Sequence, residues 1–490
     1  MAKIFYIIIT AFFLIFVQTK SIYINVNTGS DTTGDGTQGN PYKTINFGIS
    51  KAITGDSLQI SEGSYYENII MDKVVYLNGS ATNTPSVFGS VTLASNVTNW
   101  YGQILSNLNF YNTSYMLIVS SGLTFNGVVF YKVGFFLNGD ISTYNAIFNF
   151  KGSVALIQSG LTWQNCTFYT GTYKNPAGAL FSIRATGGPM IFDGILVEGY
   201  SPEGMSAQIN LCCDFDTVTV RNSRSHGGGN FYICRVSGVS IYNNIFDGGP
   251  IGISGCDSVT IENNLFNNTG DFPVYGPNPD PYPGHTGGVG ILGVDGADPQ
   301  VSDITIQNNL FVGRIRSASV MVNRWKEAPT PATFNHVSIQ YNDFSQIDDF
   351  QTSLIIDCNF TEAYMDASYN YWGSYYGPTL CAANTSCPYN PSSPSPLRVR
   401  GNVNLGSWYC DSTMQKVTTD GSNCAENPQP ETSASDDHSL AVGLGVGIPL
   451  GVALIFVAIF AVYKKRRADN LRKQIFTSYQ TGEWTSVLNN

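Results

Sequence analysis

Ten segments between residues 123 and 372 repeat one pattern of apolar and polar positions. The first position of each segment is apolar, the second carries a hydroxyl in eight of the ten, the third is nearly always apolar, and the fourth is mainly polar. An alternation with a period of two is typical of a strand that buries one face. The segments begin at Leu123, Ile141, Leu161, Met190, Val218, Val239, Val259, Ile304, Val337 and Met365.

A bend and a second core position follow each of these strands. Asparagine tolerates left-handed backbone and hydrogen-bonds its own turn, so two asparagine columns predict the bend. The first column is Asn145, Asn165, Asn222, Asn243, Asn263 and Asn308, and the second is Asn244, Asn264, Asn309, Asn342 and Asn370. Seven positions after the start, an aromatic residue returns to the core in all segments except those with Val197 and Ser225. These residues are Phe130, Phe148, Phe168, Phe246, Phe266, Phe311, Phe344 and Trp372.

The spacing of the segments indicates a coiled architecture. Consecutive starts lie 18, 20, 29, 28, 21, 20, 45, 33 and 28 residues apart. About twenty residues are enough for one coil of three short strands, so longer intervals indicate inserted loops. Such coils stack like side chain on like and bury a core only against their neighbours. Helical periodicity is nearly absent, which argues against a globular sheet covered by helices. The pattern predicts an all-β parallel β-helix.

Three stretches of the chain resemble the pectin-lyase-like superfamily of right-handed parallel β-helices, over about residues 22–373. The first is the pattern Val-x-Ile-x-Asn-Asn-x-Phe, seen in Val259–Phe266 and, with Ile first, in Ile304–Phe311. The closing Asn370-Tyr371-Trp372-Gly373 resembles the family's last coil. Residues 35–37, 40–45, 55–56 and 63–67 resemble its N-terminal cap (about residues 22–70), which implies a short amphipathic helix, roughly residues 44–53, over the open end. The resemblance is specific for fold and weak for activity.

The two ends of the chain predict a single-pass type I membrane protein. Residues 1–21 combine Lys3, an apolar run and small residues near a cleavage point, which indicates a signal peptide; the alternative is a retained anchor. Residues 440–463 carry no charge and are long enough for one transmembrane helix. Because Lys464 to Arg467 follow at once, we expect the C-terminus in the cytoplasm and the β-helix outside, at the plasma or endosomal membrane.

The remaining segments complete the predicted organisation. Residues 374–424 hold four cysteines among prolines and glycines and are expected to form a disulfide-tied C-terminal cap. Residues 425–439 form a polar stalk, and residues 464–490 form a short basic tail without a catalytic pattern. Within the span, three glycines are spaced four residues apart, a pattern that packs transmembrane helices together and is a hint of dimerisation. These glycines are Gly443, Gly447 and Gly451.

Charge, cysteines and sequons describe the environment of the outer part. Without the signal and the tail, it has 17 basic and 33 acidic residues, which argues against a nucleic-acid partner. All ten cysteines lie between Cys166 and Cys424, as in an oxidising compartment. Sequons predict N-glycosylation, although Asn165 lies in the bend of the repeat and is not expected to carry a glycan. The expected sites are Asn78, Asn96, Asn112, Asn267, Asn359 and Asn384.

The catalytic motifs of the family do not transfer to this chain. Its enzymes cut or modify acidic polysaccharides with residues that project from one sheet into a groove. Against the polygalacturonase-like pattern, Asp348-Asp349 follows Ser225-His226-Gly227 instead of preceding it, and no Asn-Thr-Asp exists. The strands that precede the aligned starts are apolar at nearly every position, so they lack the carboxylates that a lyase or hydrolase needs. We expect that surface to be covered by loops or to contact a partner.

One polar cluster remains as a candidate catalytic site. His226 and Asp247 each stand eight residues after a segment start, so the repeat places them side by side. Asp214, which is close to Asp216, and Arg235 each stand four residues before a start, so they are also predicted neighbours. Ion pairs along a solvated stack are the favoured interpretation, and a functional acid–base pair is the alternative.

No cofactor is expected, apart from Ca²⁺ as an option in the long insertion between residues 267 and 303. Carboxylates on such a loop could bind the ion. The candidate ligands are Asp271, Asp280, Asp295 and Asp298.

The same counting predicts a disulfide between Cys213 and Cys234, each five residues before its start, with Cys256 as the competing partner for Cys234. For function, the sequence favours a non-catalytic cell-surface protein of adhesion, recognition or coat structure, with glycans or neighbouring proteins as partners. The alternative is a membrane-tethered polysaccharide lyase or glycoside hydrolase that acts on acidic glycans.

Overall fold

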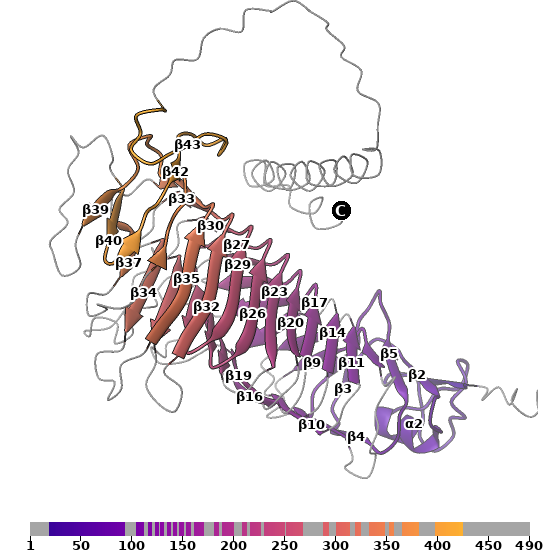
Figure 1. Cartoon of the computed structure of the whole chain (residues 1–490). Coiled ribbons are helices and arrows are strands. Elements are labelled where there is room, and N and C mark those ends of the chain that lie inside the picture. The colour runs from indigo at the N-terminus through magenta and orange to yellow at the C-terminus, as the bar shows by residue number, and fades with distance from the viewer. Residues whose placement is uncertain are drawn as a thin grey trace, which may run out of the picture. The chain divides into compact units, whose positions relative to one another are not determined.

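The computed structural model divides the chain into two compact units, Met1–Gly421 and Ser422–Asn490. Every described strand belongs to the first unit (Figure 1), and only residues 422–424 of the second are described. The described residues are 19–93, 104–111, 116–119, 123–126, 128–131, 135–138, 141–144, 147–150, 153–157, 161–170, 181–185, 189–199, 208–212, 216–226, 230–249, 251–267, 288–293, 300–313, 319–324, 333–347, 352–356, 365–381 and 397–424.

The largest sheet has 15 parallel strands and contains all ten predicted starts. Successive strands are separated in sequence by the rest of a coil, which is why every neighbour is parallel. In order, the strands are β1 (Ser21–Ile24), β2 (Ser57–Ile60), β5 (Tyr76–Gly79), β8 (Ile104–Ser106), β11 (Leu123–Asn126), β14 (Ile141–Tyr144), β17 (Leu161–Gln164), β20 (Pro189–Asp193), β23 (Thr217–Arg221), β26 (Ser237–Tyr242), β29 (Asp257–Glu262), β32 (Gln300–Gln307), β35 (Thr333–Gln340), β38 (Met365–Asp366) and β41 (Val403–Asn404).

A second parallel sheet of 12 strands follows the asparagine bend. It carries the aromatic core column predicted from the repeat. Its strands are β3 (Ser64–Tyr65), β6 (Ser86–Val87), β9 (Asn109–Tyr111), β12 (Val129–Tyr131), β15 (Ile147–Phe150), β18 (Thr167–Thr170), β21 (Leu196–Gly199), β24 (Arg224–His226), β27 (Ile245–Asp247), β30 (Leu265–Asn267), β33 (Leu310–Gly313) and β36 (Asp343–Ile347).

The third face consists of a 4-stranded and a 10-stranded parallel sheet. The first has β4 (Ile69–Met71), β7 (Val91–Leu93), β10 (Met116–Val119) and β13 (Phe135–Asn138). The second has β16 (Ser153–Ile157), β19 (Phe181–Ala185), β22 (Gln208–Cys212), β25 (Asn230–Cys234), β28 (Ile251–Ser254), β31 (Val289–Gly293), β34 (Val320–Arg324), β37 (Thr352–Ile356), β40 (Arg398–Arg400) and β39 (Thr379–Cys381). An antiparallel pair, β42 (Trp408–Tyr409) and β43 (Val417–Thr418), comes last along the chain.

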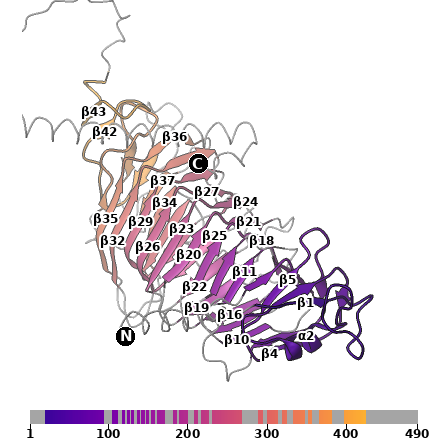
Figure 2. The same cartoon turned by 90° about the vertical axis from the view of Figure 1, so that its right-hand side faces the viewer.

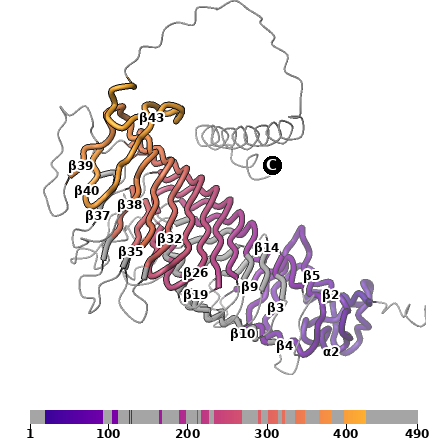
Figure 3. Tube along the Cα trace, viewed as in Figure 1, coloured from indigo at the N-terminus to yellow at the C-terminus, as the bar shows by residue number. Residues whose placement is uncertain are grey.

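The backbone register confirms the repeat. Each predicted start pairs with the next one, from Leu123 opposite Ile141 through to Val337 opposite Met365. The successive coils are visible along the Cα trace in Figure 3. Three parallel faces joined coil by coil make this unit a parallel β-helix, as predicted. Its buried side chains form one continuous cluster within residues 22–408, so the unit has its own core, as an independently folding domain requires.

An aromatic ladder runs through the core of the last coils. The rings of Phe246, Phe266, Phe311, Phe344 and Trp372 are buried and stack in sequence with centroids 4.8–5.1 Å apart.

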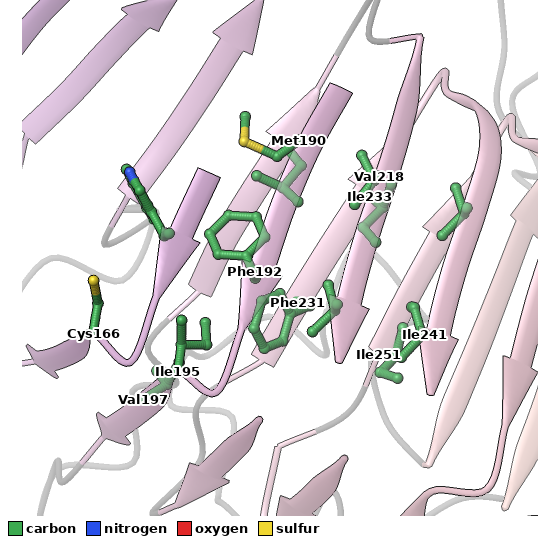
Figure 4. Close-up of a cluster of buried hydrophobic side chains, with 14 of the residues drawn as sticks. Cys166, Met190, Phe192, Ile195, Val197, Val218, Phe231, Ile233, Ile241 and Ile251 are labelled. Carbon is green, nitrogen blue, oxygen red and sulfur yellow. The ribbon is translucent and has the colours of Figure 1, made fainter. Parts of the chain in front are cut away.

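Where the aromatic column has Val197 and Ser225 instead, rings from the other two faces occupy the core. Phe192 and Phe231 meet edge to face at 6.0 Å, and Phe231 meets Phe246 at 6.1 Å. Figure 4 shows Phe192 and Phe231 in this part of the core, together with Val197. The two exceptions in the pattern are therefore positions at which small side chains leave room for aromatic residues from opposite strands.

A buried asparagine ladder runs beside the aromatic one. The backbone N–H and the Nδ2 of Asn264 both donate to Asn309 Oδ1, at 2.9 and 3.0 Å, and Nδ2 also donates to the Ile241 carbonyl at 2.9 Å. The same contacts recur from Asn244 to Asn370. The ladder thus satisfies buried backbone and amide groups at every bend. The residue before each ladder position has the left-handed backbone that was predicted, with φ 51–57° at Asn222, Asn243, Asn263 and Asn308.

Helix α2 (Ile45–Lys51) covers the first coil, as Figure 2 shows. The sequence predicted this helix over residues 44–53, and Thr44 is its N-cap. Glu67 accepts hydrogen bonds from the N–H groups of Ile45 and Asn46 at 2.8 and 2.9 Å. At Gly48 a Cβ would lie 2.4 Å from Ile24 Cδ1, so any larger residue would require the Ile24 side chain to move.

The predicted membrane segments lie outside the described residues, both the signal peptide up to residue 18 and the span at 440–463. Where the structure is described, it contains no helix of sufficient length and apolarity to cross a bilayer. In the predicted C-terminal cap, Cys381, Cys410 and Cys424 are each disulfide-bonded, in agreement with a disulfide-tied segment.

Candidate functional site

The outer side of the 10-stranded sheet is closed at the described positions of β28, β31 and β34. Ile251 and Ile253 of β28 point into the core, so Gly252 and Ser254 face outward, yet all four are buried. The same holds for the outward Gly290 of β31 and for Met321 of β34, which is 8% exposed. None of these outward positions carries a carboxylate. The apolar surface that the sequence predicted to be covered is therefore covered at these strands, and it does not form an open groove there.

The structure brings His226 and Asp247 together on the outer side of the 12-stranded sheet. His226 Nδ1 lies 2.8 Å from Asp247 Oδ2, because β24 and β27 are adjacent. Asn267 Nδ2, on the next strand β30, donates to Asp247 Oδ1 at 2.9 Å, and Arg224 Nη2 lies 3.7 Å from Asp247 Oδ2. The carboxylate is 17% exposed and the imidazole 51%. Asp247 therefore holds Nδ1 while the ring stays open to solvent, an arrangement suited to ligand contact or proton transfer.

The second predicted pair is not part of this cluster. Asp214 lies outside the described residues. Asp216 is exposed before β23, and Arg235 is exposed at a left-handed bend (φ 55°) after β25. In the described part of the chain, Arg235 makes no ion pair. Counting residues from the segment starts gives an alignment that is off by one position here, because the strand register sets Cys212, and not Cys213, opposite Cys234.

A second polar cluster surrounds Arg221 on the 15-stranded sheet, and its partners Asp193 and Tyr242 were not predicted. Arg221 Nη2 donates to Asp193 Oδ2 at 2.8 Å, and Arg221 Nη1 donates to the Tyr242 hydroxyl at 3.2 Å. Asn222 Nδ2 donates to Asp193 Oδ1 at 2.8 Å. Hydrogen bonds to Tyr242 and Asp193 raise the pKa of Arg221. The signal was present, since Asp193, Arg221 and Tyr242 all occupy the fourth position of their segments. These hydrogen bonds stabilise the sheet, although Arg221 Nε is buried without a hydrogen-bond partner among the described residues.

Three aromatic rings stack on the outer side of the first coils of the 12-stranded sheet. Tyr66 stacks on Phe88 at 4.9 Å, and Phe88 on Tyr111 at 5.2 Å. Tyr66 is 78% exposed and follows β3, the first strand of its sheet, so only one face of its ring is stacked. The backbone register continues the same position through the following strands, and we follow it as far as β30, before Val312 of β33. Its members, which we call the outer column, are Tyr66, Phe88, Tyr111, Tyr131, Asn149, Tyr169, Glu198, His226, Asp247 and Asn267.

Sequence reasoning missed the outer column, although its members directly follow the predicted core positions. Strands of two or three residues, such as β3 and β24, contain too few positions for an alternation to show. The signal that could have revealed it is the recurrence of tyrosine after a core aromatic, at Tyr111, Tyr131 and Tyr169.

The structure describes two of the six predicted glycosylation sites. The Asn267 side chain is buried, at 3% exposure, and its Nδ2 is bonded to Asp247. Nδ2 is the atom to which a glycan would be attached, so this geometry opposes glycosylation there. Asn78 is half-buried, donating to Ser57 Oγ and accepting from Ser106 Oγ, both at 2.7 Å. The sites outside the described residues are Asn96, Asn112, Asn359 and Asn384.

The calcium prediction falls on residues that are not described. The four candidate ligands lie outside the described residues: Asp271, Asp280, Asp295 and Asp298. Where the chain is described, no group of three or more His, Cys, Asp or Glu side chains could hold a metal ion. The calcium site stays a prediction.

The states of Cys234 and Cys256 remove one of the candidate partners for the predicted disulfide. Cys234 is disulfide-bonded, whereas the competing Cys256 is a free, buried thiol. Burial raises the pKa of Cys256 to about 11, so this thiol is unreactive at neutral pH. Cys213 itself lies outside the described residues, and its pairing with Cys234 stays a prediction.

Comparisons with known proteins do not identify an activity for this chain. No family model matches the chain, and no curated protein is similar to it in sequence. Among solved structures, a GH136 lacto-N-biosidase from Eubacterium ramulus is 10% identical, with a TM-score of 0.28 over 67% of each chain. A rhamnogalacturonan lyase is 12% identical, with a TM-score of 0.26 over 72% of this chain and 82% of its own. A pectate lyase is 11% identical, with a TM-score of 0.24 over 73% and 77%. At such TM-scores the fold assignment rests on the strand topology described above.

Proposed function

We propose that the β-helix is a non-catalytic glycan-recognition domain at a cell surface and that the outer column is its binding surface. The observation that carries the proposal is the continuity of this column. It begins with the stacked rings of Tyr66, which is exposed, and of Phe88 and Tyr111, which are partly buried. The same backbone position leads to the hydrogen-bonded cluster of His226, Asp247 and Asn267. Apolar platforms combined with a few oriented polar groups are what ligand sites present.

The ring geometry supports binding of sugar rings at one end of the column. Tyr66, Phe88 and Tyr111 stack face to face within 17°, so their edges, with two phenolic hydroxyls, point to solvent. Tyr66 alone keeps a free face, and the apolar C–H side of a pyranose ring packs well on such a face. A glycan that runs along the column would then meet the hydroxyls of Tyr66 and Tyr111 and, farther along, the imidazole of His226.

Recognition is favoured over cleavage because the described outward positions supply few catalytic groups. Hydrolysis or elimination on a glycan needs at least two positioned acid–base groups or a metal ion. The outer column presents the pair His226–Asp247, in which the Asp247 carboxylate is already occupied by Nδ1 of His226 and by Asn267. The acidic excess of the outer part further favours neutral glycans over acidic ones.

The test is a glycan array with residues 22–424 as the soluble probe. We expect binding to a defined set of glycans, at least tenfold weaker for Tyr66→Ala, since a stacked aromatic residue contributes roughly 1.5–3 kcal/mol. Tyr76→Ala is the matched control, because Tyr76 is a partly exposed tyrosine of the 15-stranded sheet. Absence of any glycan binding, or equal losses in both variants, would contradict the proposal.

The second candidate is a membrane-tethered polysaccharide lyase or glycoside hydrolase, and the His226–Asp247 contact favours it. An imidazole held through Nδ1 by a carboxylate can exchange a proton at Nε2. The register also sets Glu198 on the strand next to His226. Glycans that bind on the array are to be incubated with the protein and assayed for new reducing ends and for unsaturated products. Turnover that is lost in His226→Ala, with an unchanged melting temperature, would establish the enzyme.

The membrane setting belongs to the same proposal. The signal at residues 1–21, the span at 440–463 and the basic residues after it support type I insertion at the plasma or endosomal membrane. A C-terminal epitope tag should be digested by protease only after the cells are permeabilised. Digestion on intact cells would contradict the proposed topology.

A further inference from the structure

Exposed large apolar side chains gather at the two ends of the described coil stack. The N-terminal set comes from the cap region and the C-terminal set from a stretch of 12 residues, while the described coils between them expose none. The N-terminal set is Ile53, Tyr66 and Ile70, and the C-terminal set is Tyr369, Tyr375, Tyr376 and Leu380, each 36–78% exposed. Where exposed apolar groups lie side by side, as the rings of Tyr375 and Tyr376 do with centroids 4.1 Å apart, they mark a contact surface.

The C-terminal set is organised by strand β42. Trp408 is buried on one side of this strand and donates from Nε1 to the Tyr375 carbonyl at 3.0 Å, and the ring of Tyr375 lies 4.1 Å from that of Tyr376. Tyr409, the neighbouring residue, lies 6.5 Å from Tyr341, whose ring stacks on Tyr369 at 5.5 Å. The fold therefore holds tyrosine rings on both sides of β42.

Two of these tyrosines occupy strained backbone. Tyr341 and Tyr369 have φ values of 59° and 58°, at the bend position where four earlier coils in turn have asparagine: Asn222, Asn243, Asn263 and Asn308. Asparagine tolerates this left-handed conformation better than tyrosine does. Since asparagine satisfies the same bend in those coils, the bend itself does not require tyrosine. Of the two rings, that of Tyr369 is exposed, which points to a role outside the fold.

We propose that the C-terminal aromatic surface, defined as Tyr369, Tyr375, Tyr376 and Leu380, docks on the headgroup layer of a lipid bilayer. Tyrosine has an apolar ring and a polar hydroxyl, which suit it to the boundary between headgroups and acyl chains. The chain supports this occupant, because only 15 residues (425–439) separate the described cap from the predicted span. Even fully extended, they reach about 50 Å. The inference therefore rests on the proposed membrane anchoring.

The charge of the outer part restricts the kind of lipid. With 17 basic and 33 acidic residues, the domain is repelled by anionic headgroups. The contact therefore depends on burial of apolar surface and on hydroxyl–headgroup hydrogen bonds. It is made to a neutral surface such as phosphatidylcholine, and it is insensitive to salt.

The test is flotation of residues 22–424, which lack the predicted span, with phosphatidylcholine vesicles. We expect the protein to float, equally at low and high salt, and the double variant Tyr375→Ser/Tyr376→Ser to bind about tenfold less or weaker still. Tyr369→Asn guards against unfolding as an explanation. It restores the residue that the bend favours, so its melting temperature should be unchanged or higher while vesicle binding falls.

Ile70→Thr is the matched control, because Ile70 is an apolar residue of similar exposure, 58%, at the opposite end. It should leave flotation unchanged. Failure of the domain to float, or flotation that persists in both C-terminal variants, would overturn the inference. Protease protection of the full chain reports separately on the proposed anchoring, so the two failures can be told apart.

Discussion

Asp247 shows how one carboxylate can organise a surface cluster. Its Oδ2 is hydrogen-bonded to the imidazole of His226, and its Oδ1 accepts a hydrogen bond from the buried amide of Asn267. Arg224 lies 3.7 Å from the same carboxylate. The partners differ in exposure, since His226 is half exposed while Asn267 is 3% exposed. The same carboxylate therefore takes part in one interaction that water can replace and in one that it cannot.

This difference predicts unequal effects of two substitutions on stability. His226→Ala should change the free energy of unfolding by less than about 1 kcal/mol, because exposed ion pairs contribute little. Asp247→Ala should cost about 1–3 kcal/mol, because the buried amide of Asn267 loses its acceptor. Urea denaturation of residues 22–424 measures both. Equal effects would mean that the two contacts are not separate in the way described.

The same amide predicts which sequon stays empty. Asn267 belongs to an Asn-x-Thr tripeptide, but attachment of a glycan would remove its Nδ2 from Asp247 and from the buried site. Glycopeptide mass spectrometry of the secreted domain should find Asn267 unmodified. A fully occupied Asn267 would show that the folded contact does not form.

At the level of elements, the aromatic ladder concentrates stability in the coils after β24. Phe266 is buried between Phe246 and Phe311, with centroids 5.1 and 4.8 Å away. Phe266→Ala should cost about 3–5 kcal/mol, measured by chemical denaturation. Leu380→Ala, at an exposed position, is the control and should change stability little. A loss below about 1 kcal/mol for Phe266→Ala would show that the column is not core.

The strand register also changes the predicted disulfide. The bend from Cys212 to Val218 contains one residue more than the bend from Cys234 to Val239, and the strands align Cys212 with Cys234. Partner strands lie about 4.8 Å apart, within the Cα separation that a disulfide spans. We therefore expect Cys212 to compete with Cys213 for Cys234. Peptide mapping of Cys212→Ser and Cys213→Ser identifies the partner as the residue whose loss frees the Cys234 thiol.

For the whole molecule, the coil stack needs a closed first end. Helix α2 buries Ile45, Gly48 and Ile49 over strands that would otherwise present an open edge. Ile49→Asp should cost roughly 3 kcal/mol or more, because it puts an unpaired charge into this contact, and it should convert the monomer into larger species on size-exclusion chromatography. An unchanged elution volume would show that the helix is dispensable.

The sequence predicted the fold better than the site, for a physical reason. Core positions such as Val259 and Phe266 face neighbours of the same kind in the next coil, Ile304 and Phe311, so each coil repeats the constraint and the pattern becomes visible. Bends face solvent and accept an extra residue, which is why the count to Cys213 was wrong by one. The outer column lies outside the core repeat, so the recurrence of tyrosine at Tyr111, Tyr131 and Tyr169 was overlooked beside the stronger core pattern.

The asparagine ladder bears on how such a chain could change in length. Each asparagine from Asn244 to Asn342 presents the same donors to the coil after it, and its Oδ1 accepts from the coil before it. At Ser223 the series ends, because a hydroxyl takes the place of the amide. A tandem duplication of the 20 residues from Val239 to Ser258 would therefore create a junction identical to those already present. Upstream of Ser223 the same column holds Val128, Ala146, Cys166 and Ile195, so a duplication there would not extend the ladder.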